Sequence, residues 1–266
     1  MFHWDNVGAT SLRFEQQASD GVGPEPALHA LMDACAVPLV VHDYSRAAIL
    51  GNATLMRHGC NYYLLTAAHL FDHSPRCGNW LVPARDGGAL LSLEGAVVRR
   101  PVDAMRRLDL ALIDLRHVQA LARLLHGRHA LPLESVATPH AAGARDTVYA
   151  VSGFPAAWSQ FERGWLAAKR LTVLTRRARQ ACQRARHDRV YDYGRVALAS
   201  SGQWIYTPAL EGMSGAGIWA LTPGADGRHH ARLAAVQSAF LHSRYLRGHD
   251  AVAALALLLD GEPTTH

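Results

Sequence analysis

The sequence predicts an all-β sandwich or barrel with a short helix near each end. From Val37 onward, short apolar or alternating runs follow one another and are separated by turn residues, a pattern typical of antiparallel strands. The strand–helix alternation of a parallel α/β sheet does not occur. With 266 residues, of which 49% are hydrophobic and 18% are charged, the chain can bury a substantial core, and all-β barrels of about this length often fold as one unit.

The first 36 residues are expected to form an arm and a helix. Residues 1–24 are polar and lack periodicity, so we interpret them as a leading arm. Pro26 to Ala36 has apolar residues at helical spacing, and proline suits the first helical turn. This stretch therefore predicts a short helix before the body of the protein.

The body is expected to span residues 37–248. Its strand-like runs are VPLVVHD, AILGNATLMRH, NYYLLTAAHLF, WLVPA, LLSLEGAVVRR, DLALIDL, TVYAVSGFP, RLTVLT, GIWAL and RLAAVQSAF. The segment Val118 to His126 has helical spacing, and we place the boundary between two halves near residues 118–145. Residues 249–266 are expected to form a C-terminal helix and tail, because His249 to Asp260 is rich in alanine and leucine.

The net charge of +5 owes much to arginines between Lys169 and Arg189. One interpretation of this basic segment is a docking surface for an acidic partner, with an affinity that falls as salt rises. The other is a solvated helix or hairpin. The segment contains no aromatic residue on which bases could stack, which disfavours nucleic acid as the partner.

The N-terminal residues and the cysteines indicate a cytoplasmic protein. The start of the chain has no basic, then apolar, signal pattern, and the longest apolar run, Ala251 to Leu259, is about half the length that spans a bilayer. No CxxC pair is present, so we expect reduced thiols and neither a metal nor a cofactor. A Cys60–Cys77 bridge would be conceivable only if an export leader preceded the chain. The four cysteines are Cys35, Cys60, Cys77 and Cys182.

A serine can act as a nucleophile only with an adjacent base, a group that orients the base, and donors for the oxyanion. The candidate base is His69, which follows an apolar strand and the small residues of TAAH. The alternative is that His69 is one of 16 histidines and lies on the surface.

The candidate orienting acid is Asp109, which precedes an almost wholly apolar run in RRLDLALIDL. A carboxylate at the edge of such a run is partly buried and needs a partner, which His69 could supply. An ordinary strand-capping aspartate is the alternative, and Asp114 in the same run is a competing acid.

The candidate nucleophile is Ser214 in LEGMSGAGIW, with glycines at positions 212, 215 and 217. Glycine allows a sharp turn and a close approach of a substrate carbonyl, so we assign the Gly212 and Ser214 amides to the oxyanion hole. A glycine-rich turn with an incidental serine is one alternative. The overlap of GMSGAG with GxSxG, the nucleophile elbow of α/β-hydrolase esterases, is another, but it needs a parallel sheet with an acid and a histidine downstream.

TAAH, DLAL and GxSGxG, in the order His, Asp, Ser, resemble the chymotrypsin/trypsin-like serine peptidases from about Thr54 to Phe240. The resemblance implies two six-stranded antiparallel β-barrels with the triad in the cleft between them, and a C-terminal helix. It also implies that Ser214 attacks a peptide carbonyl while His69 accepts its proton and Asp109 orients His69. Ser238 in VQSAF matches the serine that lies beside the triad aspartate in this family, and it is also a candidate substrate-binding residue of the specificity pocket.

Two departures from the family pattern concern activation and compartment. Met213 stands where secreted zymogens have an aspartate that pairs with a freed N-terminus, so we expect activity without such a cleavage. Leu70 follows His69 where animal digestive members have a cysteine. The chain therefore looks more like bacterial, intracellular members of the family.

Three further positions concern the specificity pocket. Pro208 stands where trypsin-like specificity needs an aspartate, which argues against cleavage after Lys or Arg. Phe240 replaces a glycine that often lines the cleft, and Glu211 near the rim leaves room for a basic contact. The sequence thus predicts a serine endopeptidase that cleaves a protein or peptide and is restrained by its specificity or by the need for an activating partner. The alternative is a latent binding module of the same fold.

Overall fold

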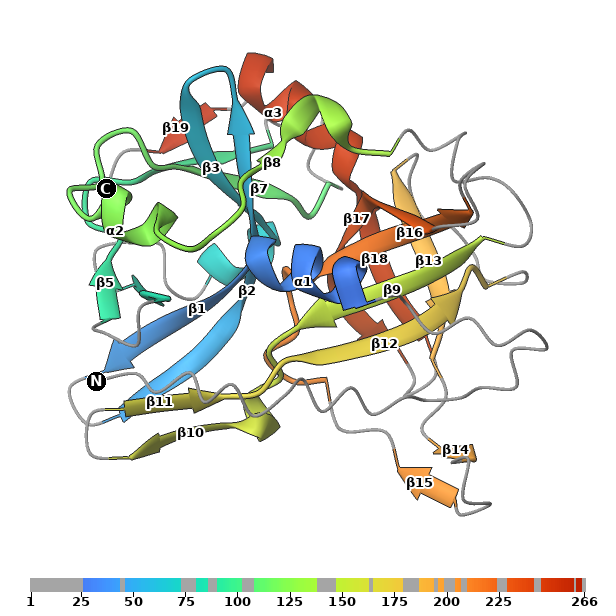
Figure 1. Cartoon of the computed structure of the whole chain (residues 1–266). Helices are drawn as coiled ribbons and strands as arrows, with labels where there is room; N and C mark the ends of the chain where they lie inside the picture. The colour runs from blue at the N-terminus through green and yellow to red at the C-terminus, as the bar shows by residue number, and fades with distance from the viewer. Residues whose placement is uncertain are drawn as a thin grey trace.

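The chain folds into two curled antiparallel sheets that lie side by side (Figure 1). The computed structural model describes residues 26–43, 46–72, 80–85, 90–101, 108–137, 147–162, 165–178, 187–193, 196–198, 204–206, 210–223, 229–241, 245–260 and 262–264. Strands dominate these residues, with small helices near both ends of the chain. The predicted all-β class and double-barrel architecture are confirmed.

The first sheet has nine strands. In spatial order they are β19 (Glu262–Thr264), β6 (Val97–Arg100), β7 (Ala111–Asp114), β3 (Asn61–Thr66), β2 (Arg46–His58), β1 (Ala36–Asp43), β4 (Trp80–Pro83) and β5 (Leu90–Ser92), with β8 (Leu131–Pro132) on β2. All pairs are antiparallel except β2 with β8. The sheet exceeds the six strands implied by the resemblance because β5, β8 and β19, of three, two and three residues, extend it.

The second sheet has six strands, all paired antiparallel. Their order is β12 (Leu171–Arg176), β9 (Val148–Gly153), β16 (Gly217–Pro223), β17 (His229–Leu241), β18 (Tyr245–Asp250) and β13 (Asp188–Asp192). Two hairpins do not pair with either sheet: β10 (Ser159–Glu162) with β11 (Trp165–Ala168), and β14 (Val196–Leu198) with β15 (Trp204–Tyr206).

Three α-helices occur in the described part of the chain. Helix α1 (Pro26–Cys35) matches the predicted helix almost residue for residue and crosses the middle of the molecule (Figure 1). Helix α2 (Leu121–Leu125) is shorter than the predicted one, and α3 (Ala254–Asp260) begins later than predicted. His249 and Asp250 belong instead to β18, because they pair with β13 and β17 inside the second sheet.

The described residues form four hydrophobic cores, and the three largest follow from the alternation of side chains along the strands. On β3, Leu64 joins the core of the first sheet, whereas Leu65 joins a core shared with the second sheet. On β16, Ile218 joins the core of the second sheet and Trp219 the shared core. The central strands are therefore buried on both faces, and the shared core joins the two sheets.

The two terminal helices close the shared core. Leu28, Met32 and Cys35 of α1 are buried in it, as are Ala254 and Leu257 of α3. Strand β19 then returns to the first sheet and pairs with β6. The segments at both ends of the body thus pack where the two sheets meet.

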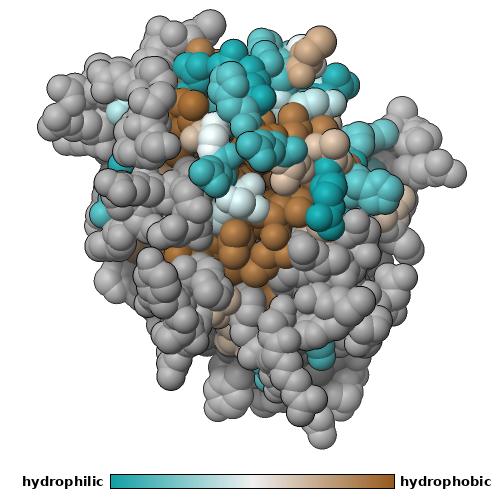
Figure 2. All heavy atoms as spheres, turned by 90° about the vertical axis from the view of Figure 1, so that its left-hand side faces the viewer, coloured by the Kyte–Doolittle hydropathy of each residue, from teal (hydrophilic) through white to brown (hydrophobic). Residues whose placement is uncertain are grey.

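On the side of the molecule that carries the first sheet, hydrophilic residues gather along the upper part and hydrophobic residues are visible in the middle (Figure 2). Within the described ranges, none of the helices has both the length and the apolar character needed to cross a bilayer.

Candidate active site

His69 projects from the turn that ends β3. The strand stops at Thr66, and a 3₁₀ turn over Ala68–Phe71 follows. Its apolar neighbours Leu70 and Phe71 are buried, while 39% of the His69 side chain is exposed. The hydrophobic neighbours therefore anchor the turn and leave the imidazole accessible.

Asp109 lies just before β7, between the buried residues Leu108 and Leu110. Because Thr66 pairs with Ala111, β3 and β7 bring His69 and Asp109 together. The backbone N–H of His69 donates to Asp109 Oδ1 over 2.8 Å, and His69 Nδ1 lies 2.7 Å from Asp109 Oδ2. These two bonds fix the orientation of the imidazole.

The competing acid Asp114 lies at the other end of β7 and is bound differently. Its oxygens accept hydrogen bonds from the backbone N–H and the guanidinium of Arg116 over 2.7–3.1 Å. Opposite it on β3 is Tyr63 rather than Thr66. Asp109, and not Asp114, is therefore the acid that meets His69.

Ser214 lies in the turn that precedes β16. Its Oγ is 3.1 Å from His69 Nε2, which completes a hydrogen-bonded chain from Asp109 through His69 to Ser214. The neighbouring Gly212 and Gly215 have φ angles of 80° and 86°, where residues with a side chain are strained. This hydrogen-bonded chain joins His69 and Asp109, which flank strands of the first sheet, to Ser214, which leads into the second sheet.

The electrostatics of the pair agree with this geometry. The hydrogen bond to Asp109 raises the pKa of His69 above its ordinary value, against the effect of partial burial. Burial alone would raise the pKa of Asp109, but the hydrogen bonds and charge of His69, with a smaller contribution from the charge of His249, lower it. Asp109 is therefore ionised at neutral pH and favours the protonated form of His69.

Hydrogen bonds to two backbone carbonyl groups fix the turn around Ser214. Glu211 O accepts from Ala156 N over 2.8 Å, and Met213 O accepts from Ala216 N over 2.9 Å. In a trans peptide the N–H points opposite to the C=O, so the Gly212 and Ser214 amides point away from these partners. Neither amide is a donor among the hydrogen bonds of the described residues. Both are available for a developing oxyanion.

The sequence reasoning missed Asn52, which reaches the same turn from β2. Its side chain lies 2.7 Å from Gly212 O, and its backbone N–H donates to Ser214 O over 2.7 Å. Asn52 is a polar residue in the apolar run AILGNATLM. A buried amide needs hydrogen-bond partners, so an asparagine within this run was the sequence feature that indicated a residue with specific polar contacts.

Three of the four residues suggested for the specificity pocket lie in the described part of the chain. Pro208 lies outside the described residues. Glu211 is exposed on the turn before Ser214. Ser238 is buried, and its hydroxyl donates to Arg247 O over 3.3 Å. Phe240 is partly exposed and contacts Tyr193 edge to face, with ring centroids 5.2 Å apart.

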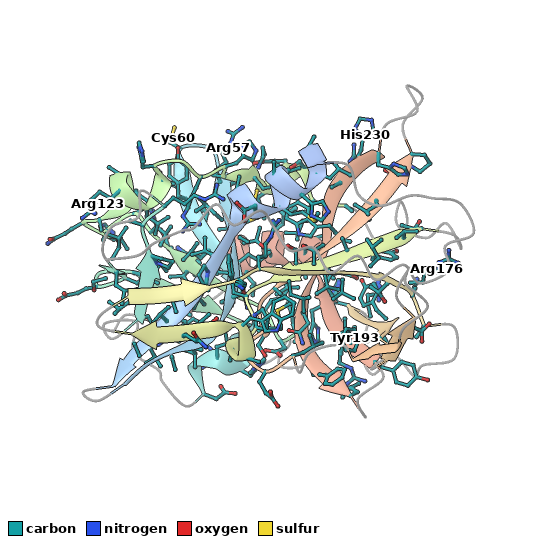
Figure 3. The ribbon with its side chains drawn as sticks, turned by 60° about the horizontal axis from the view of Figure 1, so that its bottom comes forward. Arg57, Cys60, Arg123, Arg176, Tyr193 and His230 are labelled. Carbon is teal, nitrogen blue, oxygen red and sulfur yellow. The ribbon has the colours of Figure 1, made fainter. Side chains whose placement is uncertain are left out.

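The structure also bears on the cysteines and metals. Cys35 is buried and free, and Cys60 is exposed and free at the β2–β3 turn, far from Tyr193 (Figure 3). Cys77 and Cys182 lie outside the described residues. Within the described ranges, no group of three His, Cys, Asp or Glu side chains could hold a metal ion.

The basic segment is only partly a surface feature. Its residues 171–176 form β12, in which Leu171 and Val173 are buried. Lys169 and Arg176 are exposed, and Arg176 lies at the outer edge of the molecule (Figure 3). Residues 179–186 lie outside the described residues, so the docking surface stays a prediction.

The α/β-hydrolase alternative is wrong, because Ser214 leads into a strand, β16, that is antiparallel to both its neighbours, β9 and β17. In the α/β-hydrolases the nucleophile lies on a sharp turn between a strand of a parallel sheet and a helix. The two antiparallel sheets are therefore the scaffold of this site.

Comparison with known proteins adds little. No protein-family model matches the chain, and no curated protein sequence matches it. A solved chain from work on the coupled folding and binding of the Sesbania mosaic virus VPg protein is similar, with 14% identity and a TM-score of 0.48 over 83% of this chain and 87% of that chain. Likeness at this level carries no argument about function. The two curled antiparallel sheets themselves are compatible with the chymotrypsin-like double β-barrel.

Proposed function

We propose that the protein is a serine endopeptidase that hydrolyses peptide bonds through an acyl-enzyme intermediate. The observation that carries the proposal is the continuous hydrogen-bonded chain from Asp109 through His69 to Ser214. A base within hydrogen-bond reach of a nucleophile, itself oriented by a third group, is the arrangement that activates serine. The family resemblance of the three motifs supports the same reaction.

In the acylation step, Ser214 Oγ forms a bond to the scissile carbonyl carbon as its proton passes to His69 Nε2. The oxygen of the tetrahedral intermediate gains negative charge, and the Gly212 and Ser214 amides are its proposed donors. His69 then gives the proton to the leaving amine as the C–N bond breaks. Removal of one such oxyanion donor costs about 10²- to 10³-fold in turnover, so these two amides contribute substantially to the rate.

Deacylation repeats these steps with water. His69 takes a proton from the water as its oxygen attacks the acyl carbon, and then returns a proton to Ser214 Oγ. Asp109 stays ionised throughout and stabilises the imidazolium that forms in both steps. The lowered pKa of Asp109 supports this role.

We further propose a cytoplasmic location and a restricted specificity. Free Cys35 and Cys60 agree with a reducing compartment. Met213, which is buried in the core of the second sheet, cannot pair with a freed N-terminus, so activity needs no such cleavage. Dependence on an activating partner, or on an acidic partner that binds the basic segment, would restrain proteolysis inside the cell.

Incubation of the full chain with a peptide library, followed by mass spectrometry of the products, tests the proposal. The wild type is expected to cleave a subset of peptides, and Ser214→Ala is expected to cleave none. Ser135→Ala, at an exposed serine outside the site, is the matched control and keeps the activity. Cleavage that persists in folded Ser214→Ala would contradict the proposal, and intact peptides with wild type would favour the latent binding module.

A further inference from the structure

Asn52 is a fully bonded amide inside a largely apolar part of β2. Only 1% of the residue is exposed. Its Nδ2 donates to Gly212 O over 2.7 Å and to Phe154 O over 3.2 Å, and its Oδ1 accepts from Phe154 N over 2.7 Å. Both amide hydrogens and the amide oxygen are therefore used, which is what a buried side-chain amide requires.

The partners of the Asn52 side chain all belong to the other half of the molecule. Phe154 directly follows β9, and Gly212 is part of the turn before the nucleophile. The backbone of Asn52 reinforces the link, because its N–H donates to Ser214 O over 2.7 Å. Its carbonyl in turn accepts from Thr66 Oγ1 over 2.6 Å, at the end of the strand that carries His69.

The hydrogen bond from Asn52 Nδ2 to Gly212 O determines the orientation of the turn that contains Gly212 and Ser214. The peptide between Gly212 and Met213 is held at both ends, because Gly212 O accepts from Asn52 Nδ2 and Met213 N donates to Leu210 O over 3.0 Å. The preceding peptide is held by the bond from Ala156 N to Glu211 O. Gly212 is the flexible joint between these two peptides, with a φ of 80°. Loss of the Asn52 bond would leave the Gly212–Met213 peptide held only through Met213 N, so the turn that presents the Gly212 and Ser214 amides would lose part of its support.

We propose that Asn52 is a positioning residue that holds the Gly212–Ser214 turn in the conformation that binds the oxyanion. It does so from the first sheet through the carbonyl of Gly212, next to Met213, which offers no charge for an N-terminal ion pair. The inference rests on the proposed function. It adds that the oxyanion site is assembled by a side chain that is present in the intact chain, so no cleavage is needed to form it.

The chemistry of this contact requires an asparagine. An aspartate has the same shape, but it has no N–H and would set a carboxylate against the carbonyls of Gly212 and Phe154. An alanine removes all three bonds. Asn52→Asp and Asn52→Ala therefore test the bonds in two different ways, and Asn52→Ser, whose smaller side chain leaves room for water, is a milder third variant.

The probe is a fluorophosphonate, with which Ser214 Oγ forms an O–P bond as fluoride leaves and His69 takes the proton. Intact-mass spectrometry gives the rate of the adduct. The Asn52 variants are expected to react about 10- to 100-fold more slowly than the wild type. The pH at which the rate is half-maximal should not change, because Asn52 does not touch His69 or Asp109. A general loss of structure would not produce this combination.

The matched control is Ser152→Ala, which removes a buried hydrogen bond, 3.1 Å to Thr172 Oγ1, from β9 without reaching the turn. It is expected to lose stability but to react at the wild-type rate per folded molecule, with folding measured by circular dichroism. Wild-type rates in any folded Asn52 variant would overturn the inference. A wild type that gives no Ser214-dependent adduct would instead overturn the proposed function, so the two failures can be told apart.

Discussion

Asp109 and His69 form a pair in which each residue determines the charge of the other. Two hydrogen bonds reach the carboxylate, one from the backbone N–H and one from the imidazole of His69. They raise the pKa of the imidazole and lower that of the acid. Because only neutral His69 can accept the proton of Ser214, the raised pKa has a direct effect on activity.

Activity is therefore expected to rise with pH through a midpoint above the ordinary histidine value of about 6.5. Below this midpoint His69 is protonated and cannot act as a base. In Asp109→Asn the partner charge is lost, so the midpoint should fall and turnover should fall by about 10⁴-fold. The measurement is the pH profile of kcat/KM for a peptide that the wild type cleaves.

The matched control for this change is Asp114→Asn. Asp114 is a buried carboxylate on β7 that binds Arg116 and not His69. It should lower stability and leave the pH midpoint in place. A midpoint in Asp109→Asn that equals that of the wild type would contradict the assignment of Asp109.

At the scale of elements, the turn between Leu210 and Gly217 is pressed against β2. A Cβ atom added to Gly215 would lie 1.9 Å from Asn52 O and 2.4 Å from Thr66 Oγ1. The φ of this residue is 86°. The close approach of the turn to β2 and to the end of β3 brings Ser214 within reach of His69, and it depends on the absence of a side chain at this position.

Gly215→Ala is expected to lower the free energy of unfolding by about 3 kcal/mol, from the left-handed backbone and the clash together. Gly59→Ala is the matched control: its φ is 57°, but nothing lies within 4 Å of an added Cβ. It should cost about 1 kcal/mol. Urea denaturation of both variants gives the comparison, and equal costs would contradict the close packing of the turn on β2.

At the scale of the whole molecule, the site exists only where the two sheets meet. His69 and Asp109 flank strands of the first sheet, and Ser214 leads into the second. The shared core, closed by α1 and α3, keeps these two halves together. A change in how the sheets pack would therefore separate the base from the nucleophile.

Much of this arrangement could be predicted from the sequence. Apolar runs gave most of the longer strands, because a strand buried on both faces must be apolar throughout. The spacing of apolar residues from Pro26 also gave α1. The three motifs predicted His69, Asp109 and Ser214 as site residues. The structure places His69 within hydrogen-bond reach of both Asp109 and Ser214.

Other features could not be predicted, for physical reasons. Short strands such as β8 and β19 contain two or three residues and depend on their partners rather than on their own pattern. His249 and Asp250 looked helical from composition, but pairing with β13 and β17 overrides local preference. The role of Asn52 depends on contacts with Phe154 and Gly212, which are more than 100 residues away in the chain.

The most direct test of the proposed serine peptidase is the intact mass of the full chain after reaction with a fluorophosphonate. We expect one adduct, located on Ser214, that is absent from Ser214→Ala and forms far more slowly in His69→Ala, because this variant lacks the base that accepts the serine proton. A folded wild-type protein that gains no mass, or an adduct that persists in Ser214→Ala, would contradict this proposal.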